Sequence, residues 1–326
     1  MKKLISTILI FIFLALPVYA GTNTHSIDLE QGSSQYLSIT DASQTGLDLA
    51  STFSIELWTK PETIGVNNPL VNKSNDSGSP THYGYELILG SDNKVRLRVS
   101  KDGTSSAGQF GSYATTDAVY SSAGTWKHIA ITCTVGNTPI VYIDGSSVSM
   151  TVEASITSGS VENNEEIFKI GYSVPYGRTY DGLIDEVRVW SDVRTSGEIS
   201  DNYQTELNGD EAGLVGYWKL NNSILDETSN GNDLTNNNSA VFSTDVPFAG
   251  GASDTCTYGG TGNWDVLESD NCYISSDVYV NGSLNIIGSS TGAFNCNASI
   301  SFNDLNLGTS QTTINYGPSC LFNNRN

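Results

Sequence analysis

The sequence is poor in positive charge, in histidine and in long apolar segments. It has 15 lysines and arginines against 35 aspartates and glutamates, and only 3 histidines among 326 residues. A chain this acidic repels nucleic acid and anionic lipid surfaces, which argues against nucleic-acid binding. Three histidines leave little for a zinc site or a catalytic triad, and neither a phosphate-binding loop nor a His-Glu-x-x-His motif occurs.

The one long apolar run lies at the N-terminus, in MKKLISTILIFIFLALPVYA. Two lysines precede the apolar stretch 4–16, and Val18-Tyr19-Ala20 has the small-x-small form of a cleavage site, so residues 1–20 are predicted to be a signal peptide. No later run approaches the roughly 18 apolar residues that a membrane span needs. We therefore expect an exported protein without membrane insertion, secreted or on the cell surface, whose net charge falls from −20 to −22 when both lysines are removed.

Cysteines are few and unevenly placed. Cys133 is alone in an apolar run, which is typical of a buried small hydrophobe. The other four lie near the C-terminus and, in an exported chain, predict two disulfides with three possible connectivities. Zinc is less favoured, because no Cys-x-x-Cys pair or nearby histidine accompanies them. These four are Cys256, Cys272, Cys296 and Cys320.

Alternation of apolar and polar residues at period two recurs along the chain and predicts antiparallel strands joined by hairpins. One short helix is predicted over residues 194–204, with Thr195 or Ser196 as its N-cap ahead of Glu198. An all-β, two-sheet sandwich follows. The alternating segments are 53–58, 85–89, 94–100, 126–135, 139–144, 167–172 and 183–190.

Composition divides the chain into a large and a small part. We expect one domain over residues 25–248, a small-residue linker over 249–254 and a cysteine-rich β module over 255–326. In the module, short apolar strands followed by asparagine or glycine recur at irregular spacing, as at the start of a β-solenoid.

Five ordered blocks carry a resemblance to a known family. They are FSIELWTKP, WKHIAIT, VYIDG, YDGLIDEVRVWSDVRTSGEI and GLVGYWKLNNSILDETSNGNDLT, and they extend over roughly residues 26–248. In order and spacing they resemble the laminin G-like, concanavalin A-like lectin/glucanase jelly-roll family. The resemblance implies a two-sheet jelly roll that commonly binds glycans. Because the same sandwich also serves adhesion domains and glycan-cleaving enzymes, it does not by itself give the function.

The resemblance also implies a structural calcium ion near the first strand. Glu30 stands where the family usually has an aspartate, with an added residue before Gly32, and Asp185 begins a later strand. Carboxylates and loop carbonyls are the ligands that calcium prefers. Glu30 and Asp185 are therefore the predicted metal ligands.

The acidic pair in LIDEVRVW admits a structural and a catalytic interpretation. Alternation puts Glu186 and Arg188 on one face of the strand and Asp185 on the other. If this strand runs beside residues 53–58, as in the family, Glu56 and Arg188 form a cross-strand ion pair that Glu186 can join. Glycoside hydrolysis needs two carboxylates on one face about 5–10 Å apart, and the Glu-x-Asp-x-x-Glu motif of related enzymes is absent. We expect no catalytic residues.

Glycan binding needs aromatic faces for sugar C–H groups and planar polar groups for hydroxyls. The segment NKSNDSGSPTHYGYEL supplies tyrosines, KVRLRVS puts arginines on one face, and a histidine and a tyrosine of later strands could border them. The alternative is that the arginines merely solvate an exposed face and the tyrosines cap the sandwich edge. The predicted carbohydrate-binding residues are Tyr83, Tyr85, Arg96, Arg98, His128 and Tyr142.

From these observations we expect a secreted, non-catalytic protein that binds a glycan or a glycosylated surface, as in adhesion. One rival is a structural surface protein without a glycan ligand. A second is a glycan-cleaving enzyme of unfamiliar type. The sequence leaves the sugar and the oligomeric state open.

Overall fold

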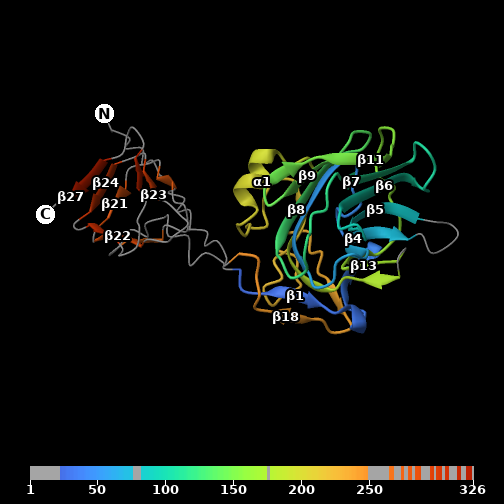
Figure 1. Ribbon diagram of the computed structural model, residues 1–326, viewed down its shortest axis with the longest axis horizontal. Coiled ribbons are helices and arrows are strands. Elements are labelled where there is room, and N and C mark those ends of the chain that lie inside the picture. Colours follow the sequence, from blue (N-terminus) through green and yellow to red (C-terminus); the bar gives the residue numbers. More distant parts are fainter. Residues whose placement is uncertain are drawn as a thin grey trace, which may run out of the picture.

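A computed structural model describes residues 23–75, 82–174 and 177–248, together with short segments between residues 264 and 324. The first part is a sandwich of two antiparallel sheets, as the sequence predicted (Figure 1). In sheet A the strand order is β10 (Ser146–Val148), β9 (Ile140–Ile143), β8 (Lys127–Thr134), β3 (Thr52–Pro61), β15 (Gly182–Trp190), β1 (Ser26–Leu29) and β18 (Val241–Ser243), and β16 (Leu214–Trp218) also pairs with β15.

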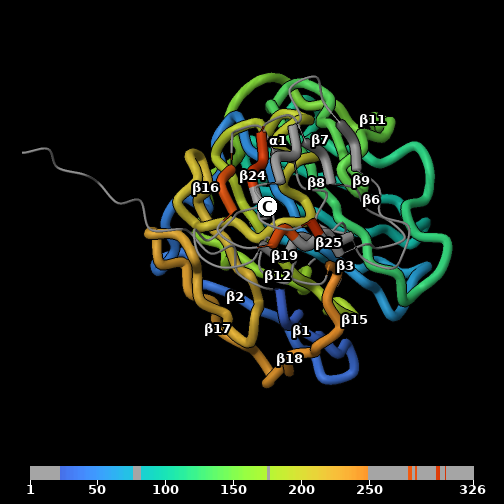
Figure 2. The backbone as a smooth tube through the Cα atoms, turned by 90° about the vertical axis from the view of Figure 1, so that its left-hand side faces the viewer, coloured from blue at the N-terminus to red at the C-terminus, as the bar shows by residue number. Residues whose placement is uncertain are grey.

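Sheet B packs against sheet A. Its strand order is β11 (Met150–Ala154), β7 (Phe110–Thr115), β6 (Val95–Gly103), β5 (His82–Leu89), β4 (Asn68–Asn75), β12 (Phe168–Ile170), β2 (Tyr36–Ile39) and β17 (Thr235–Asn237). A separate hairpin of β13 (Tyr172–Ser173) and β14 (Arg178–Thr179) follows β12. Figure 2 shows β1, β2, β17 and β18 gathered at one end of the sandwich.

The core lies between the inner faces of the two sheets. Because alternate residues of a strand point to opposite faces, a row of directly paired residues lies on one face. Every residue of two such rows is fully buried, and each buried Val, Leu or Ile side chain contributes about 1.5–3 kcal/mol. The rows are Leu37, Ile170, Val71, Leu87 and Leu97 in sheet B and Val141, Ile131, Ile55 and Val189 in sheet A.

Short helices cover the edges and the outside of the sandwich. The α-helix α1 (Ser196–Asn202) begins at the N-cap Thr195, whose side chain accepts from the Glu198 backbone while the Glu198 side chain accepts in return. This capping box confirms the helix start predicted from the sequence. Two 3-10 turns, η1 (Gln31–Ser33) and η2 (Asp41–Ser43), flank β2. No helix among the described residues is long and apolar enough to cross a membrane.

The C-terminal part contains parallel strands. Each of three sheets has three strands that recur along the chain in the same order, which is the arrangement of a β-solenoid, as the sequence suggested. The sheets are β19 (Trp264–Leu267), β22 (Leu284–Ile287) and β25 (Leu305–Leu307); β20 (Tyr273–Ile274), β23 (Phe294–Cys296) and β26 (Ile314–Tyr316); and β21 (Val278–Tyr279), β24 (Ser299–Phe302) and β27 (Leu321–Asn324).

The first and last strands of the sandwich pair with each other. Ser26 of β1 lies opposite Ser243 of β18. Beyond β18, Asp245 is bound by the Lys60 ammonium and by the Trp126 indole N–H. Phe248 then packs its ring 5.9 Å from that of Trp58. The chain is thus fixed to sheet A as far as the end of this described segment.

Candidate functional site

Three of the six predicted carbohydrate-binding residues share the outer face of sheet B. Arg96 and Arg98 alternate there with buried Val95, Leu97 and Val99, and the Tyr83 ring lies 5.4 Å from that of Phe110. Both arginines are already engaged by this chain's own carboxylates.

Two Nη atoms of Arg96 donate to the Asp92 carboxylate at 2.6 Å each, and its Nε donates to Glu153 at 3.0 Å. These hydrogen bonds lower the pKa of Asp92 to about 2. Arg98 donates to Glu86 at 3.3 Å. Sequence alternation predicted the face of these arginines correctly, but it could not reveal the carboxylates that occupy them.

The other three predicted residues lie elsewhere. Tyr85 points into the core, is 1% exposed and donates its hydroxyl to the Leu47 carbonyl at 2.9 Å. A register shift between Tyr83 and Tyr85 separates their directions. His128 and Tyr142 belong to sheet A, where they are buried. The structure therefore does not form the expected six-residue surface, because Tyr85 shares its face with core residues Leu87 and Leu89, and the other two belong to the other sheet.

The two predicted calcium ligands are also far apart. Asp185 is fully buried and accepts hydrogen bonds from the Asn23 amide at 2.8 Å and the Glu186 N–H at 2.9 Å. The pairing of Ile27 with Ile184 places Ser26 opposite Asp185. Glu30 is four residues further along the strand, which corresponds to about 13 Å. One ion cannot bind both carboxylates.

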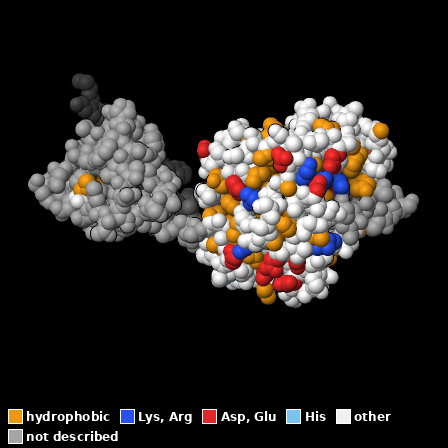
Figure 3. All heavy atoms as spheres, viewed as in Figure 1, with side chains coloured by type: hydrophobic (Ala, Val, Ile, Leu, Met, Phe, Trp, Pro, Cys, Tyr) orange, Lys and Arg blue, Asp and Glu red, His pale blue; other side chains and the backbone are white. Residues whose placement is uncertain are grey.

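Glu30 instead neighbours other acidic side chains at the end of the sandwich where β1 lies, and Figure 3 shows acidic groups gathered there. Burial raises the pKa of Asp28, and repulsion from Glu30 and Asp181 raises it further. In residues that the structure describes, no group of three or more His, Cys, Asp or Glu side chains is arranged to hold a metal. Calcium binding remains a prediction from the resemblance.

The structure shows the surroundings of Cys133 but not those of the four tail cysteines. Cys133 is an unpaired cysteine buried in the sandwich core, as expected, and burial raises the pKa of its thiol to about 12. Of the tail cysteines, Cys256, Cys272 and Cys320 lie outside the described residues, and only the strand position of Cys296 is described. The two predicted disulfides stay predictions.

The acidic pair at Asp185 and Glu186 is buried on the outer face of sheet A. The register of the pairing between β15 and β3 changes between Asp185 and Arg188, and Glu186 adopts a left-handed backbone conformation with φ of 51°. This β-bulge overturns the simple alternation: Ile184 and Val187 both face the core, while Asp185 pairs with Trp58 and Arg188 with Glu56 on the outer side.

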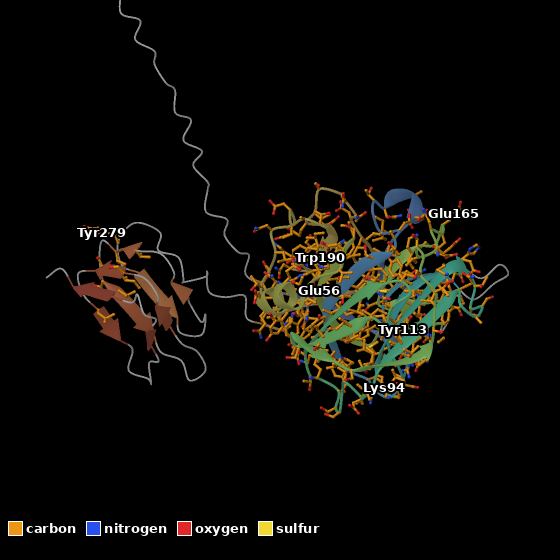
Figure 4. The ribbon with its side chains drawn as sticks, turned by 90° about the horizontal axis from the view of Figure 1, so that it is seen from above. Glu56, Lys94, Tyr113, Glu165, Trp190 and Tyr279 are labelled. Atoms are coloured by element: carbon orange, nitrogen blue, oxygen red, sulfur yellow. The ribbon has the colours of Figure 1, made fainter. Side chains whose placement is uncertain are left out.

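Arg188 is the centre of this outer cluster. Its Nη2 donates to Glu186 at 2.7 Å, its Nη1 lies 3.8 Å from Glu56, and it also binds backbone carbonyls of Asn202 and Thr205. The predicted Glu56–Arg188 cross-strand pair is therefore confirmed. Figure 4 shows Glu56 and Trp190 close together beside α1, whose Ile199 packs over the neighbouring strands.

The charges of the cluster are set by burial and by Arg188. Burial raises the pKa of Glu186 to about 7 despite the attraction of Arg188. Burial would also raise the pKa of Glu56, but His128 and Arg188 outweigh it and lower that pKa. Each acid is fully enclosed by protein, so the arrangement fits a structural role that joins α1 and the following loop to sheet A.

An open cleft lies beside β2 and the β13–β14 hairpin. Its volume is about 260 Å³. The rings of Tyr36 and Tyr172, both half-buried, stand 4.8 Å apart at a tilt of 31°. The lining is otherwise mostly polar, and it consists of Gln31, Ser34, Tyr36, Tyr172, Gly177, Arg178, Thr179 and Asn238.

Local backbone geometry builds this cleft. Gly171 ends β12 with φ of +80°, and a Cβ there would come within 2.4 Å of the Leu29 side chain. Only glycine fits both conditions, and it turns the chain out of sheet B so that Tyr172 reaches Tyr36. On the opposite rim, the Asn238 amide donates to the Ser34 carbonyl at 2.6 Å and joins two loops.

Arg178 lines the same cleft from β14. Its Nε is buried and has no hydrogen-bond partner within the described chain. The sequence analysis missed the cleft entirely. One signal was available, because Tyr36 alternates with the apolar Leu37 and Ile39 and so had to face outward.

Comparisons with known proteins agree with this architecture. Residues 31–200, just over half of the chain, match the laminin G-like profile of the concanavalin A-like lectin/glucanases superfamily. A search of curated proteins finds no match. Among solved structures, a Bacteroides ovatus protein provisionally described as carbohydrate-binding has 20% identity and a TM-score of 0.51, and the match covers 72% of this chain and 62% of that one.

Two further structures are more distant. The SAP-like pentraxin of Limulus polyphemus, a heptamer, has 13% identity and a TM-score of 0.42, with coverage of 69% of this chain and 97% of the pentraxin. The CBM40 domain of a Ruminococcus gnavus sialidase, solved with α2,6-sialyllactose, has 11% identity and a TM-score of 0.42, with coverage of 56% and 98%. Two antiparallel sheets of this order, together with the profile match, show that the chain belongs to the concanavalin A-like lectin/glucanases superfamily, with a laminin G-like sandwich.

Proposed function

We propose that this protein is an exported, non-catalytic carbohydrate-binding protein whose sugar site is the cleft between Tyr36 and Tyr172. The aromatic pair in an open, polar cleft is the observation that carries the proposal. Tyrosine rings offer apolar faces for the C–H groups of a sugar and hydroxyls for its rim. Gln31 adds a side-chain amide and Asn238 adds its amide oxygen, and both can exchange hydrogen bonds with sugar hydroxyls.

The cleft is held in shape before any ligand arrives. The Asn238–Ser34 hydrogen bond fixes one rim, and the Gln35 amide donates to the Asn238 carbonyl at 3.2 Å. A preformed site loses less conformational entropy on binding. An open cleft nevertheless buries only part of a sugar, so we expect weak single-site affinity and useful binding only when several copies meet a glycosylated surface.

Buried carboxylates support binding without hydrolysis. Asp185 and Glu186, the pair that suggested catalysis, are enclosed beneath α1 and engaged by Asn23 and Arg188. A glycosidase needs two carboxylates flanking the bond that it cleaves. The groups that line the cleft are aromatic, amide, hydroxyl and guanidinium groups. The provisional description of the similar Bacteroides protein points in the same direction.

A glycan array with the chain lacking residues 1–20 tests the proposal, run with and without calcium. We expect Tyr36→Ala and Tyr172→Ala each to reduce binding at least tenfold without lowering thermal stability, because both rings are partly exposed. Tyr279→Ala is a matched control, since Tyr279 is 60% exposed and lies in the tail (Figure 4).

Three outcomes would contradict the proposal. Unchanged binding by both cleft variants places the site elsewhere. No binding to any glycan, together with self-association, favours the structural surface protein. Release of reducing ends from a polysaccharide favours the enzyme.

A further inference from the structure

We infer that the cleft binds a sugar unit that carries a carboxylate, and that Arg178 is the residue that binds it. This inference rests on the proposed carbohydrate-binding function and names the ligand class of that site. Three observations carry it: the unpaired state of Arg178, its position beside the aromatic pair, and the small size of the cleft.

Arg178 differs from every other arginine that the structure describes. The other four each lie within 4 Å of a carboxylate, whereas Arg178 has no such partner within residues 23–75, 82–174 and 177–248. Acidic residues outnumber lysines and arginines more than twofold in this chain, so an arginine without an acidic partner is notable. Acidic partners of the others are Asp92, Glu86, Glu186 and Glu198.

The Nε of Arg178 is a donor removed from water without a partner. Because water does not reach this Nε, a ligand meets Arg178 at its two Nη groups, which have no carboxylate partner within the described residues. These two groups form a planar fork that matches the two oxygens of a carboxylate. A carboxylate therefore satisfies Arg178 better than a single hydroxyl can.

The other cleft residues fit a sugar around that carboxylate. Tyr36 and Tyr172 supply apolar ring faces, and Asn238 and Gln31 supply neutral polar groups. About 260 Å³ is at the small end of ligand-binding pockets, which suits one sugar unit better than an extended chain. The expected ligand is thus a uronic or related acidic sugar, at the end of a glycan or exposed along it.

The negative electrostatic potential around the cleft disfavours the binding of densely charged polyanions. Gln31 lies between the cleft and the acidic residues Glu30 and Asp181, and its N–H donates to Asp181 at 3.1 Å. With a net charge of −20, the protein repels sulfated polyanions over the range at which salt does not screen them. One carboxylate placed on Arg178 gains a short-range bidentate contact that outweighs this repulsion.

Calorimetric titration with matched ligands tests the inference. The probes are trigalacturonic acid against its methyl ester, and sialyllactose against lactose. We expect wild type to bind at least one acidic probe tenfold or more tightly than its neutral counterpart, which is about 1.4 kcal/mol. Arg178→Gln should abolish that preference, so that each acidic probe binds no more tightly than its neutral counterpart.

Lys94→Gln is the control for net charge. Lys94, which Figure 4 labels, also lacks an acidic partner among the described residues. It is not one of the residues that line the cleft. This variant should keep the acidic preference. If it loses the preference as Arg178→Gln does, the effect belongs to the overall field and the inference is wrong.

The failure of this inference is distinguishable from that of the proposed function. If wild type binds acid and ester equally, while Tyr36→Ala abolishes the binding of both, the cleft binds sugar but Arg178 does not select a carboxylate. If wild type binds neither these probes nor any glycan on the array, the proposed function itself is overturned.

Discussion

Replacing Arg188 with methionine should destabilise the sandwich without touching the cleft between Tyr36 and Tyr172. Its guanidinium donates to Glu186 at 2.7 Å and to the carbonyls of Asn202 and Thr205 at 3.0 and 2.5 Å. Methionine fills similar space but donates nothing. Glu186 and Glu56 would then be buried carboxylates without their cation, and the loop after α1 would lose its attachment to β15.

The size of the expected loss in the free energy of unfolding follows from the burial of Arg188 and Glu186. Arg188 is 1% exposed and Glu186 is fully buried. Removing one partner of such a pair costs about 3–5 kcal/mol, because the remaining charge stays out of water. In a domain of this size each kcal/mol lowers the melting temperature by about 2–4 °C, so we expect a fall of roughly 6–20 °C.

Thermal and urea unfolding followed by tryptophan fluorescence measure this effect, since Trp58, Trp190 and Trp218 all report on the sandwich. Arg188→Met combined with Glu186→Gln should recover part of the loss, because the unpaired charge is gone. Arg96→Gln, at a half-exposed ion pair, should cost no more than about 1 kcal/mol. The reasoning fails if Arg188→Met melts with wild type, and above all if it stays stable while a hydrolytic activity disappears.

Three further predictions concern protonation, cysteine and calcium. Burial lowers the pKa of Lys169 from 10.5 to about 8. Between these pH values the unfolded chain binds more protons than the folded chain, so the free energy of unfolding should rise with pH. Lys169→Met should flatten that rise, which urea titrations at several pH values would measure. Non-reducing mass spectrometry should find two disulfides in the tail and a reduced Cys133, and four alkylatable tail thiols would refute the pairing. Millimolar calcium should raise the melting temperature relative to EDTA, and an unchanged melting temperature would show that the predicted calcium site is wrong.

Local features of the fold could be predicted from the sequence, because their causes are local. The strands follow from alternation, and the start of α1 follows from Thr195 and Glu198, which are three residues apart. The faces of β15 could not be predicted, because the bulge at Glu186 inserts one residue and reverses the alternation. The core position of Tyr85 could have been predicted, because alternation puts Tyr85 on the same face as Leu87 and Leu89.

The cleft was beyond sequence reasoning for a different reason. Tyr36 and Tyr172 are distant in the chain and meet only because β12 pairs with β2 and Gly171 then redirects the backbone. Each tyrosine alone is an ordinary strand residue. Likewise, the acids that engage Arg96 come from a turn and from an edge strand, and no sequence pattern near Arg96 indicates the second of them. The contacts of these site residues could be predicted only with knowledge of the strand order in the sheets.

The pairing of β1 with β18 has a mechanical consequence. Because Ser26 and Ser243 lie opposite each other, a force that pulls the two ends of the sandwich apart acts across the ladder and opens its hydrogen bonds one after another. Such a peeling geometry resists tension poorly. The contacts of Asp245 with Lys60 and Trp126, and of Phe248 with Trp58, come before that ladder on the path of the load. Under tension between the two ends of the sandwich, these side chains, more than the sheets, would set the force at which the domain begins to open.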